Sequence, residues 1–227
     1  MAAKLSKKEL RDPDFFQASI QKFTDYFYEN TTRFYSILAT SILAIVIAVG
    51  IYLYWNDYQT NATKIYAKAQ TSMLRNRQNT EGISSDTMII FKELIDKYPH
   101  SWSARMAYYH MGNIYYNSGE LDNAIGSYKK FLSSVRSDDA GIKFLALTSL
   151  GYCFEAKKDF KLALDYFEQA QKSNNTGFEA IGFRNIARIY EQLNDKKKAL
   201  ENYQNALKMA IDPSMALFIK HKISSLS

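Results

Sequence analysis

The most distinctive feature of the hydropathy pattern is an uncharged run, FYSILATSILAIVIAVGIYLYW, at residues 34–55. At about 1.5 Å per residue, a helix of this length covers roughly 33 Å, which is enough to cross a hydrocarbon core of about 30 Å. Aromatic residues lie at both ends, with Phe34 and Tyr35 at the start and Tyr54 and Trp55 at the close. Such aromatics are enriched at membrane–water interfaces. The pattern therefore predicts a transmembrane helix at residues 34–55.

A cleaved signal peptide is the alternative interpretation of this run. The apolar core of a signal peptide is usually about 7 to 15 residues long and lies close to the start of the chain. Here residues 1–33 precede a longer run, so we expect an uncleaved anchor. Lys and Arg within about 20 residues of the run do not decide its orientation. The basic residues of the whole segment 1–33 favour an N-terminus in the cytoplasm.

Small residues recur every four positions within the run and therefore share one face of the predicted helix. They are Ser36, Thr40, Ala44 and Ala48. Small residues at this spacing allow a second membrane helix to approach closely. The alternative is that the stripe is incidental, because small residues are common in membrane helices.

The segment before the run predicts an amphipathic helix in the tail 1–33. Asp12 is a suitable N-cap with Pro13 at the first helical position. An apolar stripe with spacings of four, three and four follows, formed by Phe16, Ile20, Phe23 and Phe27. Two placements remain open, one on the membrane surface and one against the protein itself. Acidic residues in this segment make it a poor electrostatic binder of anionic lipid.

After the run, apolar positions recur in three similar copies at residues 105–138, 144–177 and 180–213. In each copy an apolar residue and a small residue are followed at fixed offsets by an aromatic, an alanine and a second aromatic. These landmarks are Met111-Gly112, Tyr115, Ala124 and Tyr128; Leu150-Gly151, Phe154, Ala163 and Phe167; and Ile186-Ala187, Tyr190, Ala199 and Tyr203.

Two further segments extend this series. A degenerate copy at residues 68–101 keeps Phe91, Leu94 and Pro99 in phase but has Arg75 at the small position. A last helix at residues 214–227 carries an apolar stripe and is expected to cover the open end of the series. Its stripe consists of Met215, Ile219, Ile223 and Leu226.

The landmarks resemble the tetratricopeptide repeat, a helix–turn–helix unit of about 34 residues in which small residues let the two helices touch. The fold class implied is all-α: one N-terminal transmembrane helix followed by a tetratricopeptide-repeat solenoid at residues 56–227 with a C-terminal capping helix. An unrelated helical bundle is the alternative, but it would have to reproduce the same landmarks in three places by accident.

Composition agrees with a helical chain and offers little catalytic chemistry. Nine Gly and three Pro are few for a tightly turned all-β fold. The only cysteine, Cys153, excludes an internal disulfide and a Cys-based zinc site. His100, His110 and His221 are scattered, and no common catalytic or phosphate-binding motif is present. We expect no enzymatic activity, no cofactor, no metal and no small-molecule substrate.

The net charge of +6 does not point to nucleic acid. The longest basic run is Lys196, Lys197 and Lys198, and it is not accompanied by a nucleic-acid-binding motif. A solvated helix face is the better interpretation of this run, so we expect no nucleic-acid partner.

The resemblance implies a groove lined mainly by the first helix of each repeat, where protein partners bind. Carried onto this chain, its groove positions are Tyr109, Asn113, Tyr116, Asn117, Tyr152, Glu155, Arg184, Arg188 and Glu191. Tyr and Arg are frequent anchors of protein interfaces. Some members of the family clamp a C-terminal carboxylate with Lys and Asn, but Tyr109 occupies the position of that Lys.

The whole arrangement resembles the bacterial YfgM-like family. The resemblance rests on the early span, the degenerate repeats, the Asp12-Pro13-Asp14-Phe15 element and the closing segment at residues 222–227. That family is described as ancillary to the SecYEG translocon, anchored in the inner membrane with its repeats in the periplasm beside the chaperone PpiD. The resemblance implies translocon subunits, a periplasmic chaperone and unfolded client chains as partners of a single-pass inner-membrane protein.

Two other functions fit the same architecture. One is a scaffold for envelope assembly or cell division. The other is a receptor for protein import whose repeats face the cytosol. The side of the membrane on which the repeats lie separates the receptor from the other two.

Overall fold

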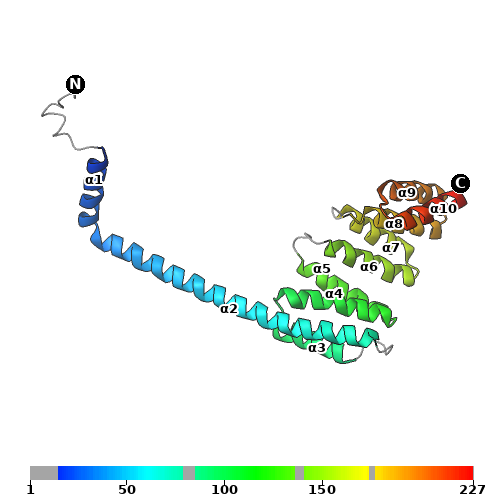
Figure 1. Cartoon of the computed structure of the whole chain (residues 1–227), viewed down its shortest axis with the longest axis horizontal. Coiled ribbons are helices and arrows are strands. Elements are labelled where there is room, and N and C mark those ends of the chain that lie inside the picture. Colours follow the sequence, from blue (N-terminus) through cyan, green and yellow to red (C-terminus); the bar gives the residue numbers. More distant parts are fainter. Residues whose placement is uncertain (1–14, 79–84, 136–140, 174–176, 227) are drawn as a thin grey trace, which may run out of the picture. The chain divides into compact units, whose positions relative to one another are not determined.

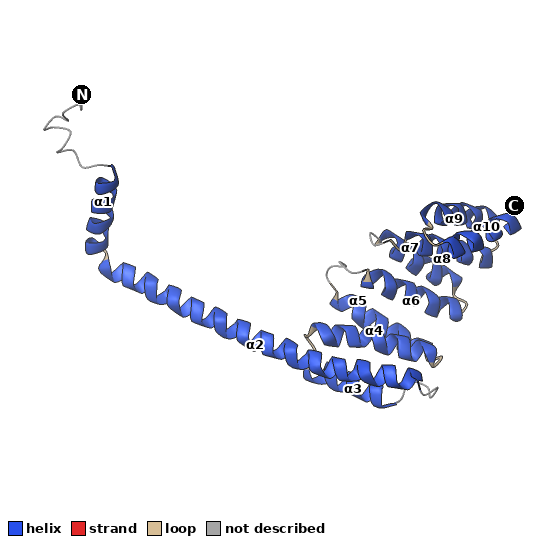
Figure 2. Cartoon of the chain, in the orientation of Figure 1, coloured by secondary structure: helices blue, strands red, loops and turns tan. Residues whose placement is uncertain are grey.

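The computed structural model describes residues 15–78, 85–135, 141–173 and 177–226. These residues form helices, turns and short connections, without a strand in the described ranges (Figure 2). The predicted all-α fold is therefore confirmed. The chain divides into two compact units, Met1–Asp57 and Tyr58–Ser227.

The first unit contains α1 (Phe15–Glu29) and the beginning of α2 (Thr31–Gln78). The predicted cap at Asp12 and Pro13 lies outside the described residues. One helix in the described part of the chain is long and apolar enough to cross a membrane, and it covers Thr31–Arg75. Its apolar side chains are exposed throughout residues 34–55, as expected for a segment whose apolar surroundings would be lipid.

The second unit is a series of helix pairs (Figure 1). The C-terminal part of α2 and α3 (Ser85–Lys97) come first in the chain. Three pairs follow: α4 (Trp102–Asn117) with α5 (Leu121–Ser134), α6 (Ile142–Ala156) with α7 (Phe160–Lys172), and α8 (Glu179–Gln192) with α9 (Lys196–Met209). The last helix is α10 (Pro213–Leu226).

Local chemistry sets where these helices begin and turn. Asp159 and Asp195 cap α7 and α9, each accepting a hydrogen bond from the backbone N–H three residues ahead at 3.1 Å. Each turn inside a pair contains one residue with positive φ, namely Gly119, Lys158 and Asn194. A left-handed residue just past a helix end lets the chain reverse at once. The short reversal places the second helix of each pair against the first.

Glycine allows the two helices of a pair to approach closely. A Cβ added to Gly112 would lie 2.5 Å from the Tyr128 ring, and one added to Gly151 would lie 2.5 Å from the Phe167 ring. Because both rings are almost fully buried, neither can move aside into solvent. The third pair has Ala187 at the aligned position, so the packing between its two helices accommodates a methyl group there.

We expect Gly151→Ala to destabilise the second unit by about 1 to 3 kcal/mol, because the added methyl overlaps the buried ring. Gly126→Ala is the matched control, since a Cβ at Gly126 meets nothing within 4 Å. That change should be neutral or should stabilise by up to about 1 kcal/mol through helix propensity. Urea unfolding of residues 58–227, followed by circular dichroism, measures both variants. Equal free energies of unfolding for the two variants would contradict the close approach of Gly151 to the Phe167 ring.

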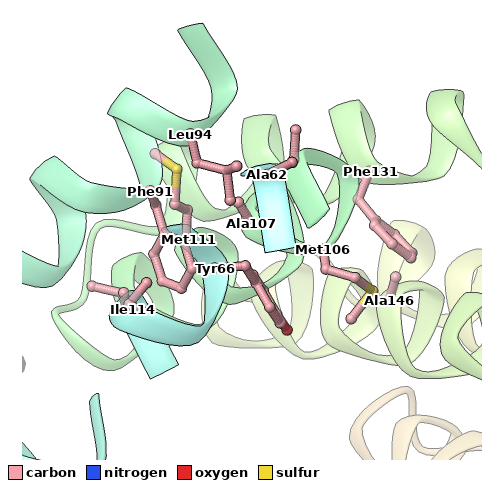
Figure 3. Packing of buried hydrophobic residues seen from close by; sticks show 12 residues of the cluster. Ala62, Tyr66, Phe91, Leu94, Met106, Ala107, Met111, Ile114, Phe131 and Ala146 are labelled. Atoms are coloured by element: carbon pink, nitrogen blue, oxygen red, sulfur yellow. The ribbon is translucent and has the colours of Figure 1, made fainter. Parts of the chain in front are cut away.

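The largest core cluster joins five consecutive helices, from α2 to α6 (Figure 3). Tyr66 of α2, Phe91 of α3 and Phe131 of α5 supply its aromatic rings, and Ala146 of α6 closes it. All four side chains are at most 7% exposed. The helix pairs are therefore not independent units, because each buries its apolar face against the next pair.

The α2–α3 pair, which precedes these three pairs, begins earlier than the bound of residue 68 predicted for the degenerate copy. Its second helix holds Phe91 and Leu94 fully buried, in phase with the landmarks. Its first helix buries Ala62 and Ala69 and leaves Arg75 exposed, so packing begins before residue 68. The reason is that α2 continues without a break out of the apolar run, from Thr31 to Gln78.

The last helix, α10, packs against the third pair through the predicted stripe. Ile219 is fully buried in a cluster with Ala187, Tyr203 and Ala206. Lys222 donates a hydrogen bond to Glu191 of α8 at 2.8 Å, which ties α10 to the preceding pair. The predicted cap of the solenoid thus has both apolar and ionic contacts to the helices that it covers.

Candidate protein-binding groove

Four of the predicted groove residues meet at one shallow cavity of about 480 Å³. Tyr116 comes from α4, Tyr152 and Glu155 come from α6, and Arg188 comes from α8. Ala156 completes the lining. The cavity is therefore shared by the first helices of three successive pairs. We call these five residues the groove cluster.

Arg188 connects the third pair to the second. Its Nη2 donates to Oε2 of Glu155 at 2.7 Å, and its guanidinium lies 5.2 Å from the centre of the Tyr152 ring. Burial raises the pKa of Glu155, and the charge of Arg188 opposes that rise. The ion pair and the cation–π contact hold the guanidinium and the ring in one arrangement.

Asn185, which the sequence did not single out, is hydrogen-bonded to two of the predicted groove residues. It is fully buried, and its Oδ1 accepts hydrogen bonds from Tyr152 Oη at 3.2 Å and from Arg184 Nη2 at 3.3 Å. Arg184, another predicted groove residue, is thus held by the same amide. Nothing in the sequence marks Asn185, because the aligned positions of the other copies are occupied by His110 and Ser149.

Three predicted groove residues have contacts within the fold. Tyr109 packs against Phe131, with ring centres 5.7 Å apart. Asn113 Oδ1 accepts a hydrogen bond from Tyr128 Oη at 2.7 Å. Glu191 accepts from Lys222 and from Tyr203, which places it under the cap. The structure does not bring these three into the groove cluster.

Two remaining features of the groove bear on what it can bind. Asn117 is exposed at the C-terminal end of α4. Tyr116 is 36% exposed, and partial burial raises the pKa of its hydroxyl, which therefore stays protonated at neutral pH. The groove cluster offers a neutral phenol, an aromatic face and a paired charge, which suits contact with a polypeptide better than acid–base chemistry.

The stripe in the apolar run has its hydroxyls satisfied inside the helix. Ser36 donates to the carbonyl of Arg33 at 2.8 Å, and Thr40 donates to the carbonyl of Ser36 at 2.9 Å. The donor hydrogens of both hydroxyls are therefore used inside the helix, and close packing with Ala44 and Ala48 would supply most of the contact with a second helix on this face. That such a helix packs there stays a prediction.

The cysteine and one of the histidines, which could in principle carry chemistry, are packed within the fold. Cys153 is fully buried, and burial raises the pKa of its thiol to about 11, so the reactive thiolate is scarce near neutral pH. The Nε2 of His110 lies 2.7 Å from Tyr66 Oη, and its ring stacks on Phe91. In the described ranges, no group of three or more His, Cys, Asp or Glu side chains is arranged to hold a metal ion.

A family model described as a tetratricopeptide repeat-like domain matches residues 26–227. The chain belongs to this family. Its domains are protein-interaction modules and are generally not enzymes, so a protein-interaction scaffold is the general function, and no catalytic family is indicated. The match does not select a subgroup within the family. No curated protein matches the chain by sequence.

Solved structures show the same fold. The crystal structure of MamA is 18% identical, covers 67% of this chain and 80% of its own, and superposes with a TM-score of 0.53. PilF of Pseudomonas aeruginosa is 16% identical, with 73% of this chain and 72% of its own covered and a TM-score of 0.54. At this level of identity the similarity concerns the arrangement of helices alone.

Proposed function

We propose that this protein is a single-pass membrane-anchored scaffold that holds extended segments of other proteins across the groove cluster. The observation that carries the proposal is the shared cavity, in which α4, α6 and α8 each contribute a side chain. An extended segment that crosses successive first helices contacts all three pairs at once. The long apolar part of α2 supports the membrane anchor.

The chemistry of the groove cluster favours polypeptide of mixed sequence. Its exposed tyrosine presents a flat apolar ring with a hydroxyl, a combination common in protein interfaces. Its two charged members, Glu155 and Arg188, already pair with each other. Binding should therefore be only weakly sensitive to salt, since no net charge of the cluster attracts the ligand over a distance.

We place this scaffold in the bacterial inner membrane with its repeats in the periplasm, beside the Sec translocon. There it would hold a periplasmic chaperone or newly translocated chains. The support for this finer statement is the resemblance to the YfgM-like family together with the basic residues of segment 1–33. An anchored scaffold at the translocon exit would meet chains while they are still extended.

Reporter fusions after residue 227 test this topology. We expect alkaline phosphatase to be active there, because it folds only outside the cytoplasm, and green fluorescent protein exported by the Sec route to stay dark. Fusions to residues 1–33 should give the opposite pattern and serve as the control. Dark phosphatase and bright green fluorescence after residue 227 would place the repeats in the cytosol and favour the import-receptor function.

A further inference from the structure

The two sides of α1 differ sharply in polarity. Ile20 and Phe23 belong to the apolar stripe and are 49% and 66% exposed. Its charged residues, Lys22, Asp25 and Glu29, follow one another at spacings of three and four, so they gather within about 60° of the helix circumference on the opposite side. The described side chains thus leave an apolar face open along a helix with a separate charged face.

The connection to α2 fixes where this helix can lie. Only Asn30 separates α1 from α2. Its N–H donates to the carbonyl of Tyr26 at the end of α1, and its carbonyl accepts from the N–H of Phe34 at the start of α2, each at 3.0 Å. The end of α1 is therefore within about 8 Å of the start of the apolar run along the helix. That distance is about the depth of the headgroup layer on one side of a bilayer.

We propose that α1 lies along the membrane surface with Ile20 and Phe23 in the lipid and its charged face in water. This inference rests on the membrane anchor of the proposed function. An upright α1, about 22 Å long, would carry its apolar stripe far into water. A helix lying in the interface buries the same stripe at the boundary between headgroups and acyl chains.

The net charge of α1 shows whether the helix would bind the membrane by its apolar face or by attraction to anionic lipid. The helix carries one basic and two acidic residues, which gives a net charge of −1. Anionic lipid headgroups therefore do not attract it, and the apolar face supplies the binding. Insertion should be the same in neutral and in moderately anionic membranes.

The test places one fluorescent label on each face of α1 in the full chain. In a Cys153→Ala background, we would attach the dye NBD to Phe23→Cys on the apolar face or to Asp25→Cys, its matched control on the charged face. A third label at Ile42→Cys, on the side of the apolar run opposite the small-residue stripe, reports on the anchor. The proteins are reconstituted into phosphatidylcholine vesicles, with doxyl-labelled lipid as the quencher in the membrane and iodide as the quencher in water.

We expect doxyl lipid to quench the label at residue 23 at least about threefold more than the label at residue 25, and iodide to show the reverse order. This ratio should be unchanged when phosphatidylglycerol is added. Equal access of iodide to residues 23 and 25 would overturn the inference, because α1 would then stand in water.

Two other outcomes would also overturn it, and they identify different failures. A label at residue 23 that is shielded from iodide and from doxyl lipid means that protein covers the apolar face, while the anchor stands. A label at residue 42 that doxyl lipid does not quench means that the anchor of the proposed function fails, and the surface placement fails with it.

Discussion

Phe131→Ala is expected to lower the free energy of unfolding of residues 58–227 by about 3 to 5 kcal/mol. Phe131 is 1% exposed and belongs to the cluster that joins α2 to α6. Removing its ring leaves a cavity where successive pairs meet, and the neighbouring rings are fixed by their own contacts, among them Tyr109 at 5.7 Å. A loss of this size would leave little stability in a domain of ordinary size.

The control for this prediction is the same substitution on the outer face of the cap. Phe218 is 49% exposed on α10, so Phe218→Ala should cost less than about 1 kcal/mol. Urea denaturation followed by circular dichroism measures both. If the two substitutions cost the same, the helix pairs do not share one continuous core.

The second large effect concerns binding. Tyr116→Ala and Arg188→Ala should each weaken the binding of an extended chain by about 1 to 2 kcal/mol, or about five- to thirtyfold. Tyr116 loses an exposed ring, and Arg188→Ala removes the group that holds both Tyr152 and Glu155. Fluorescence anisotropy with reduced, carboxymethylated lactalbumin, a permanently unfolded chain, measures the affinity of residues 58–227.

Leu162→Ala is the matched control for the groove variants, because Leu162 is 41% exposed on α7 and lies outside the groove cluster. Its affinity should equal that of the wild type. Raising the salt concentration should change the wild-type affinity by less than about twofold, since the charges of the cluster are paired. Unchanged affinity of a folded Tyr116→Ala, Arg188→Ala double variant would exclude the groove cluster as the binding site.

The repeats could be predicted from the sequence because their packing is local and periodic. Gly151 and Phe167 meet within one helix pair, so a small residue and an aromatic at a fixed offset are enough to indicate the contact. The start of the α2–α3 pair could not be predicted in the same way. Because α2 is one unbroken helix from Thr31 to Gln78, no turn residue marks where helix pairing begins.

The groove was predicted only in part for a related reason. Of the predicted positions on the first helices, Tyr116, Tyr152 and Arg188 lie at one cavity, and their role in binding stays a prediction. Whether a side chain is available there depends on partners from other helices. Glu191 is bound by Lys222, which lies 31 residues further along the chain, and no pattern within a repeat predicts that contact.

The most direct test of the account is site-specific photo-crosslinking in cells that produce the full chain. Benzoylphenylalanine at Tyr116 should give covalent adducts with protein partners, because this residue is 36% exposed in the groove cluster. The same group at Leu162, which is 41% exposed on α7, should give none. Adducts at residue 116 that disappear when Arg188→Ala is added would support a protein-binding groove. Adducts of equal strength at both positions, or at Leu162 alone, would contradict it.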